Sequence, residues 1–259
     1  MSSDPNKRQQ AVVRKMYRLL SRAWGPQHWW PAETPFEIIV GAILTQNTSW
    51  TNVDKALTKL RQANVLSVRG IRAVPLEELE QLVRSSGYYR QKAARLKGFV
   101  AFLDQRYGGS FTKLFAIPTE RLRTELLSLR GIGQETADAI LLYAGKHEIF
   151  VVDAYARRIL ERHALAGVGA SYNEVRALIE HALRRELPAK PIVRGTTLQR
   201  IVVHEPTPMS ESHGSSVAQV YNEMHGLFVQ VGKHYCYKEE PDCPHCPLRT
   251  LLPDSRFRP

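Results

Sequence analysis

A turn of alternating apolar residues and glycines places the strongest constraint on how this chain can fold. It reads LRGIGQETA from Leu129 to Ala137 and lies between two segments with helical periodicity. Glycine reaches backbone angles closed to other residues and leaves the main chain uncovered. The first N–H groups and the positive dipole end of the following helix then face outward, which suits a phosphate. Gly-x-Gly occurs in many tight turns, so the turn alone predicts two joined helices and no particular function.

Helical periodicity continues through most of the chain and predicts an all-α fold. Residues 11–23 form an amphipathic pattern. Pro35 opens a run over 36–44 that is apolar nearly all round, which predicts a central buried helix. Further helices are expected near 52–63, 75–85, 90–106, 119–127, 134–144, 154–163, 171–184 and 217–231, and one short extended piece is expected at 196–204.

Residues 187–216 differ in composition from the rest of the chain. They are rich in proline, glycine and serine, which is typical of a loop or linker. A connection of this length is unusual within a compact domain. We therefore interpret the segment as an inserted, partly mobile loop.

The overall charge points to a polyanionic partner. The 259 residues carry 36 Lys and Arg against 25 Asp and Glu, a formal net charge of +11. A generally basic soluble protein is the alternative. No apolar run reaches the roughly 18 residues of a membrane span, and no hydrophobic signal core follows the N-terminus. These features predict a cytoplasmic protein.

A second motif gives the turn a functional meaning. VVDAYARR, from Val151 to Arg158, places a lone aspartate, Asp153, after a β-branched apolar run. The two motifs together resemble the helix-hairpin-helix and the catalytic aspartate of the endonuclease III superfamily of DNA glycosylases. The similarity covers about residues 25–250.

The resemblance implies a two-lobed, all-α helix-hairpin-helix glycosylase fold. A central six-helix domain would span 32–145, with the hairpin at 121–144. The second helical domain would combine 1–31 with 146–259 and include the cysteine loop 236–246. DNA would lie across the cleft between the domains with the target nucleotide flipped out, because its glycosidic bond cannot be reached within the stack.

Asp153 is the candidate catalytic residue. Cleavage of an N-glycosidic bond builds positive charge on the sugar, and a fixed carboxylate stabilises that charge and orients or deprotonates the nucleophile. The alternative is a simple N-cap on the helix expected at 154–163. The two roles are compatible, because a cap position fixes the side chain.

The helix after the turn lacks the lysine of bifunctional relatives. Their motif is Gly-x-Gly-x-Lys-Thr-Ala, and Glu135 takes the place of that lysine. A carboxylate cannot form a Schiff base. We therefore expect a monofunctional enzyme in which water attacks, with a displaced lysine such as Lys146 or Lys233 left as the open alternative.

Two further segments resemble the DNA-contacting loops of the family. LTQNTSW, from Leu44 to Trp50, contains a glutamine that would help fill the gap left by the flipped base. SGYYRQKA, from Ser86 to Ala93, would wedge into the opposite strand. The alternative is an ordinary polar loop at a helix end. The expected DNA contacts are Tyr88, Arg90, Lys92, Gly131, Gly133, Gln134 and Thr136. Gln46 is expected to join Trp29, Trp30 and Trp50 in the base pocket.

The four tryptophans lie within the first fifty residues. Trp24 lies before the pair Trp29 and Trp30, and Trp50 follows the Gln46 loop. The pattern resembles the base pocket of endonuclease III-like 3-methyladenine DNA glycosylases. N-alkylated purines are cationic, and an aromatic face attracts a cation by roughly 0.5–2 kcal/mol. Packing in the core or at a domain interface is the alternative for Trp29 and Trp30.

The three cysteines follow the spacing Cys236-x6-Cys243-x2-Cys246. This matches the first three ligands of the family's [4Fe–4S] loop, but the fourth position is Leu252. Three interpretations stay open. A cluster has His, Asp or an exogenous fourth ligand; a zinc ion binds the cysteines with His234 or His245; or the loop is a relic held by packing.

These observations predict a DNA N-glycosylase of base excision repair that removes alkylated purines from double-stranded DNA. It is expected to act as a monomer on nucleoid DNA in the cytoplasm, without a membrane. One alternative is a glycosylase for deaminated or oxidised bases with AP-lyase activity. The other is a non-catalytic helix-hairpin-helix DNA-binding protein, which would need neither Asp153 nor the tryptophan pocket.

Overall fold

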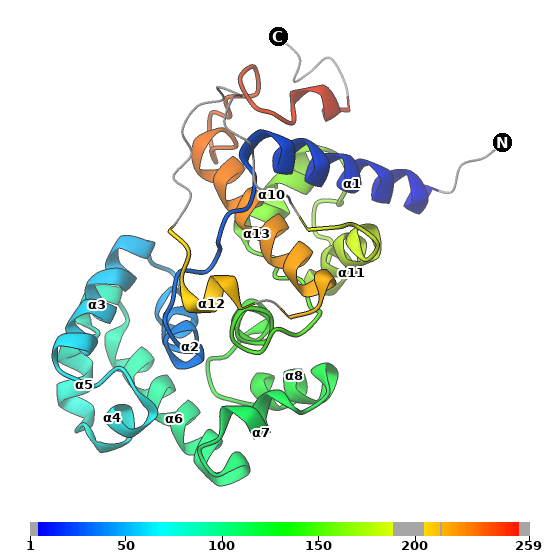
Figure 1. Cartoon of the computed structure of the whole chain (residues 1–259). Coiled ribbons are helices and arrows are strands. Elements are labelled where there is room, and N and C mark those ends of the chain that lie inside the picture. The colour runs from blue at the N-terminus through cyan, green and yellow to red at the C-terminus, as the bar shows by residue number, and fades with distance from the viewer. Residues whose placement is uncertain (1–4, 189–204, 213, 254–259) are drawn as a thin grey trace. The chain divides into compact units, whose positions relative to one another are not determined.

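The computed structural model describes residues 5–188, 205–212 and 214–253 (Figure 1). Within these ranges the chain forms helices and contains no strand, which confirms the predicted all-α class. None of the helices described is long and apolar enough to span a membrane. The extended piece expected at 196–204 lies outside the described residues.

Two compact units make up the chain. One contains residues 32–147, and we call it the hairpin unit. The other joins residues 1–31 to 148–259, and we call it the aspartate unit because it contains Asp153.

The hairpin unit is a set of short helices around one apolar helix. Its helices are α2 (Pro35–Leu44), α3 (Trp50–Gln62), α4 (Val68–Ala73), α5 (Leu76–Leu82), η1 (Arg84–Ser86), α6 (Tyr89–Tyr107), α7 (Phe111–Phe115), α8 (Thr119–Leu127), α9 (Gln134–Ala139) and the π-helical turn η2 (Ile140–Ala144).

Helix α2 is the centre of this unit, as its composition predicts. Thr34 caps it by accepting a hydrogen bond from the N–H of Glu37, and Pro35 occupies the first turn. Residues 36–44 are all buried, and α2 packs against α3, α6 and η2. The helix is therefore enclosed on several sides, which explains why its apolar residues cover the whole circumference.

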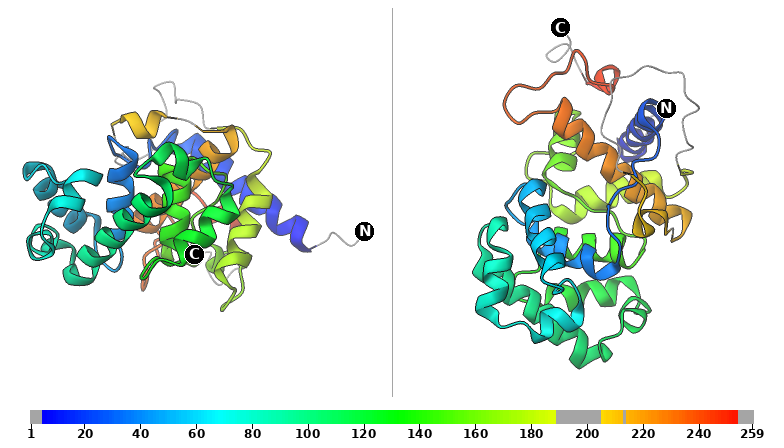
Figure 2. Two further views of the ribbon diagram at one scale, coloured as in Figure 1. Left: turned by 90° about the horizontal axis from the view of Figure 1, so that it is seen from below. Right: turned by 60° about the vertical axis from the view of Figure 1, so that its left-hand side comes forward.

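The aspartate unit contains longer helices. They are α1 (Pro5–Trp24), α10 (Ala154–Arg162), α11 (Tyr172–Leu183), α12 (Pro208–Glu211), α13 (Ser216–His234) and η3 (Arg249–Leu251). Helix α13 packs against α1, α10 and α11, and the views of Figures 1 and 2 show α1, α11 and α13 grouped together. Helix α12 lies in the described part of the segment expected to be an inserted loop.

Two glycines let other segments approach α13 closely. A Cβ atom at Gly232 would lie 2.1 Å from the ring of Tyr155, so α10 packs directly on the backbone of α13 there. At Gly226 a Cβ atom would lie 3.1 Å from the Cβ atoms of Gln27 and Trp29. These contacts place the start of α10 and the tryptophan segment against the same helix.

Short helices are where the sequence prediction falls short. Helices α4 and α7 were not expected, although Ser67 and Ser110 cap them. With 6 and 5 residues, they are too short to show a helical repeat. The single helix expected at 134–144 instead changes from α9 to the wider turn η2 at Ile140.

Candidate active site and DNA-binding elements

Asp153 is the N-cap of α10 with its carboxylate fixed by a backbone hydrogen bond. The Ala156 N–H donates to Oδ1 at 2.7 Å, and the side chain is 13% exposed. The backbone at Asp153 is extended, the conformation expected at a cap. The second oxygen, Oδ2, lies 3.4 Å from Nε2 of His225. One oxygen thus caps the helix while the other faces a buried histidine.

His225 is the partner that sequence patterns did not indicate. It lies in the middle of α13 and is 5% exposed. Its ring centroid lies 6.1 Å from that of Trp29 and 6.2 Å from that of Phe150. The imidazole therefore lies against two aromatic rings, with Nε2 near the carboxylate of Asp153.

Lys233 interacts electrostatically with Asp153. Although the residue as a whole is exposed, desolvation around its ammonium group lowers its pKa, and the negative charge of Asp153 partly opposes that shift. The ammonium nitrogen lies 5.8 Å from the centre of the Trp29 ring. Of the two lysines considered as displaced nucleophiles, Lys233 therefore shares the aspartate unit with Asp153. Burial lowers the pKa of the other, Lys146, to about 8, but it belongs to the hairpin unit.

Trp29 and Trp30 of the aspartate unit differ in exposure. Trp30 is 7% exposed and belongs to the core, so the packing alternative describes it better than a base-pocket role. Trp29 is only partly buried and contacts His225 and Lys233. Glu223 anchors the preceding segment by accepting the Gln27 N–H at 2.7 Å. Burial raises the pKa of Glu223 to about 7.

The hairpin turn is held by one side chain from α6 and one from the loop between α2 and α3. Gly131 has φ +82°, and a Cβ atom there would lie 2.1 Å from the Arg95 guanidinium. Gln46 donates to the Gly131 carbonyl at 3.0 Å and to the Thr136 hydroxyl at 2.8 Å, and it accepts from Arg95. Gln46 is therefore tied to the turn, and the role of Thr136 is to hold Gln46, because Thr136 is itself buried.

The start of α9 is open. Gly133 is its N-cap and provides no side-chain cap, and a Cβ atom there would meet nothing within 4 Å. Glu135 is exposed at the position of the family lysine. Below the surface Arg123 of α8 donates to the fully buried Asp138 of α9 at 2.6 Å. This buried ion pair joins the two hairpin helices.

In the predicted wedge loop, the exposure of Tyr88 suits its predicted role, whereas the burial of Lys92 does not. Tyr88 is 66% exposed and adopts a left-handed conformation, φ 46°, immediately before α6. Arg90 is also exposed and lies 3.8 Å from Glu80. Lys92, expected to contact DNA, is 1% exposed and donates to the carbonyls of Leu44 and Ser86. It ties the ends of two helical segments together and cannot reach a phosphate.

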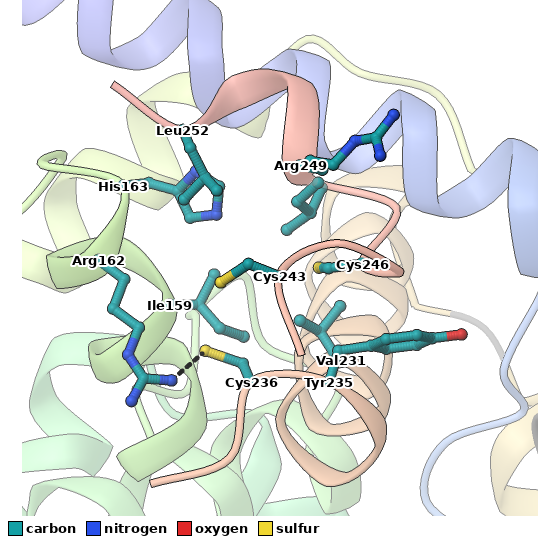
Figure 3. A pocket seen from close by; sticks show the side chains of 11 residues that line it. Ile159, Arg162, His163, Val231, Tyr235, Cys236, Cys243, Cys246, Arg249 and Leu252 are labelled. Carbon is teal, nitrogen blue, oxygen red and sulfur yellow. Dashed lines mark hydrogen bonds between the residues drawn. The ribbon is translucent and has the colours of Figure 1, made fainter. Parts of the chain in front are cut away.

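The cysteine loop surrounds a cavity in the aspartate unit. Cys236, Cys243 and Cys246 line it together with Leu252, which is 6% exposed (Figure 3). Arg162 donates to the sulfur of Cys236 at 3.1 Å. Within the described residues no three His, Cys, Asp or Glu side chains converge closely enough for a single metal ion. The loop thus places its three thiols around one space.

The predicted site residues therefore fall into two groups. Asp153, Trp29, Trp30 and the cysteines belong to the aspartate unit. The other group belongs to the hairpin unit and comprises Gln46, Trp50, Tyr88, Arg90, Lys92, Gly131, Gly133, Gln134 and Thr136. Trp50 is the first residue of α3 and is partly exposed.

Comparisons with known proteins show what this chain is similar to. The profile of the HhH-GPD superfamily base excision DNA repair proteins matches residues 40–185. A Methanocaldococcus jannaschii protein that is provisionally named a DNA repair glycosylase is 37% identical over 244 residues. The matched residues cover 93% of this chain and 95% of the relative.

Two solved structures are also similar. One is the H. pylori 3-methyladenine DNA glycosylase MagIII bound to 1,N6-ethenoadenine, at 29% identity and TM-score 0.65, covering 89% of this chain and 98% of that one. The other is endonuclease III in a trapped covalent complex with DNA, at 23% identity and TM-score 0.68, covering 100% and 99%. The chain therefore belongs to the HhH-GPD superfamily of base excision DNA repair proteins, in its endonuclease III-like group of DNA glycosylases.

Proposed function

We propose that this DNA glycosylase is monofunctional and hydrolytic and that it removes alkylated purine bases from double-stranded DNA. The observation that carries the proposal is the fixed carboxylate of Asp153 beside His225, combined with Glu135 at the lysine position. The protein would act as a monomer on DNA in the cytoplasm.

Asp153 supplies the charge that the reaction needs. As the bond between sugar and base breaks, positive charge develops on the sugar, and a carboxylate held in place stabilises it without reorganising. The Ala156 N–H holds one carboxylate oxygen, and Nε2 of His225 lies 3.4 Å from the other. The same carboxylate can take a proton from the attacking water, which leaves an abasic site.

A partly exposed aromatic face supports alkylated purines as substrates. Trp29 offers such a face beside His225. An aromatic ring stacks on any purine and also attracts a cationic one. The similar H. pylori glycosylase was solved with an alkylated adenine derivative bound. Trp50 of the hairpin unit is the second candidate contact with the base.

Contact with DNA is assigned to the hairpin unit. The uncapped start of α9 presents backbone N–H groups at an open surface, as a phosphate requires. Tyr88 is the exposed aromatic side chain able to enter a gap in the base stack.

Lys233 supports a second candidate function, a bifunctional glycosylase with AP-lyase activity. Its pKa is lowered, so more of its amine is unprotonated at neutral pH than in a lysine with an ordinary pKa, and it interacts with Asp153. Attack by this amine would form a Schiff base with the sugar and lead to strand cleavage.

We also propose that the cysteine loop binds an iron–sulfur cluster. Three thiols line one cavity, and cysteine thiolates are the usual ligands of iron–sulfur clusters. The Arg162 N–H that reaches the Cys236 sulfur would stabilise the thiolate. In this proposal the cluster supports the fold of the loop and takes no part in base excision.

A panel of duplexes tests the function. Each duplex carries one lesion, 3-methyladenine, 7-methylguanine, 1,N6-ethenoadenine, hypoxanthine, uracil or 8-oxoguanine, and products are separated with and without alkali. We expect release of the alkylated purines, with strand breaks only after alkali. Borohydride trapping of a covalent adduct that is lost in Lys233→Gln would favour the bifunctional alternative, and release of uracil or 8-oxoguanine alone would contradict the substrate class.

A further inference from the structure

The cavity of the cysteine loop is lined by a histidine that the cysteine spacing gives no reason to consider. His163 is the C-cap residue of α10, directly after Arg162, and is 7% exposed. It lines the same cavity as the three cysteines and Leu252 (Figure 3). The end of helix α10 therefore places a nitrogen donor at this cavity. The position where the loop would carry its fourth cysteine is the apolar Leu252.

A backbone hydrogen bond sets the tautomer of His163. Its Nδ1 lies 3.2 Å from the carbonyl oxygen of Leu251. A carbonyl oxygen can only accept, so Nδ1 carries the proton and the lone pair of the neutral ring is on Nε2. Metal-bound histidines commonly donate their other ring N–H to a backbone carbonyl in this way. The residue that accepts this bond is the immediate neighbour of Leu252.

We propose that His163 is the fourth ligand of the iron–sulfur cluster, through Nε2, and replaces the thiolate missing at Leu252. The proposal rests on the cluster proposed above. Imidazole nitrogen is an established ligand of iron in iron–sulfur proteins. The other two candidate histidines, His234 and His245, are not among the residues that line this cavity. His245 is exposed and its Nδ1 lies 2.6 Å from Asp242, whereas His234 is exposed at the end of α13.

The test is spectroscopic and uses the whole protein prepared without oxygen. Iron and sulfide are counted first, and the cluster is then reduced with dithionite in protein labelled with 15N-histidine. Pulsed EPR is expected to show the strong nitrogen coupling of a directly bound imidazole. The coupling should vanish in His163→Cys, which keeps a ligand and the cluster, and persist in the control His245→Ala.

Cluster loss in air gives an independent readout. We expect His163→Ala to lose its visible absorbance about tenfold faster than the wild type. The double variant His163→Ala with Leu252→Cys should regain the wild-type rate or better. Circular dichroism of each variant establishes that it is folded.

Each result has one meaning. A wild-type protein without iron, whose Leu252→Cys variant does bind a cluster, overturns His163 as a ligand and leaves the loop as a cluster site. Absence of iron in both proteins overturns the cluster as well, while the glycosylase assay remains a separate measurement. A cluster without nitrogen coupling in the wild type also overturns the proposal.

Discussion

Two helices in this protein differ in whether a side chain accepts a hydrogen bond from their first N–H groups. Helix α10 is capped by its own side chain, because Asp153 accepts the Ala156 N–H. Helix α9 starts at Gly133, which has no side chain, in an open environment. The first arrangement fixes a carboxylate, which we propose acts in catalysis, and the second leaves N–H groups that we propose bind a phosphate of DNA. The same local structure can thus serve catalysis or DNA binding, depending on one cap residue.

Asp153→Asn is expected to give the largest effect. Asparagine keeps the cap and the approximate size but removes the negative charge. We expect the single-turnover excision rate to fall by about 10³-fold, because charge stabilisation in the transition state is lost. Rapid-quench assays with enzyme in excess measure this rate. A loss of less than tenfold would mean that Asp153 is only a cap.

Glu223→Gln tests a carboxylate that lies within α13, away from a helix start. Its pKa is about 7 in the folded protein and near 4.5 when unfolded. The folded state therefore holds the proton more tightly. The resulting stability is complete below pH 4.5 and is lost as the pH rises to about 7.

A difference of one pKa unit between the folded and unfolded states corresponds to about 1.36 kcal/mol. The free energy of unfolding should therefore fall by about 3 kcal/mol between pH 4.5 and about 7. The Gln variant should lack that decline. Urea unfolding between pH 4.5 and 8 measures the difference. Parallel curves for the two proteins would show that Glu223 is not protonated in the fold.

Gly133→Asp would give α9 the kind of cap that α10 has. The backbone at Gly133 is extended and open, so the side chain fits. The new carboxylate would occupy the N–H groups and repel phosphate. We expect DNA affinity to fall about tenfold while the helix becomes slightly more stable. Fluorescence anisotropy measures affinity, and Gly133→Ser, which caps without charge, is the matched control. Unchanged affinity for Gly133→Asp would remove α9 from the DNA contact.

Asp153→Ala measures how much the N-cap hydrogen bond of Asp153 contributes to the stability of the protein. Compared with Asp153→Asn, it also removes the cap, so we expect the variant to be less stable by about 1 kcal/mol. Thermal or urea unfolding of the two variants gives this difference directly. Equal stability would show that the hydrogen bond to Ala156 contributes nothing.

The residues that the sequence could predict are those with a local signal. The apolar run of α2, the Gly-x-Gly turn and the lone Asp153 are each visible within about ten residues. Buried polar partners leave no such signal, because their environment forms only when distant segments pack. His225 beside Asp153 and Asp138 beneath Arg123 were therefore missed. Lys92 was assigned to DNA for the same reason, because its sequence does not reveal the two carbonyls it binds.

The central claim is that the capped and the uncapped helix start have separate roles. The most direct measurement is a double-mutant cycle of Asp153→Asn and Gly133→Asp on one lesion duplex. It records Kd and the single-turnover rate at saturating enzyme. We predict that Asp153→Asn lowers only the rate, that Gly133→Asp weakens only Kd, and that the effects add within about 0.5 kcal/mol. An Asp153→Asn protein that excises at the wild-type rate when saturated would contradict the account.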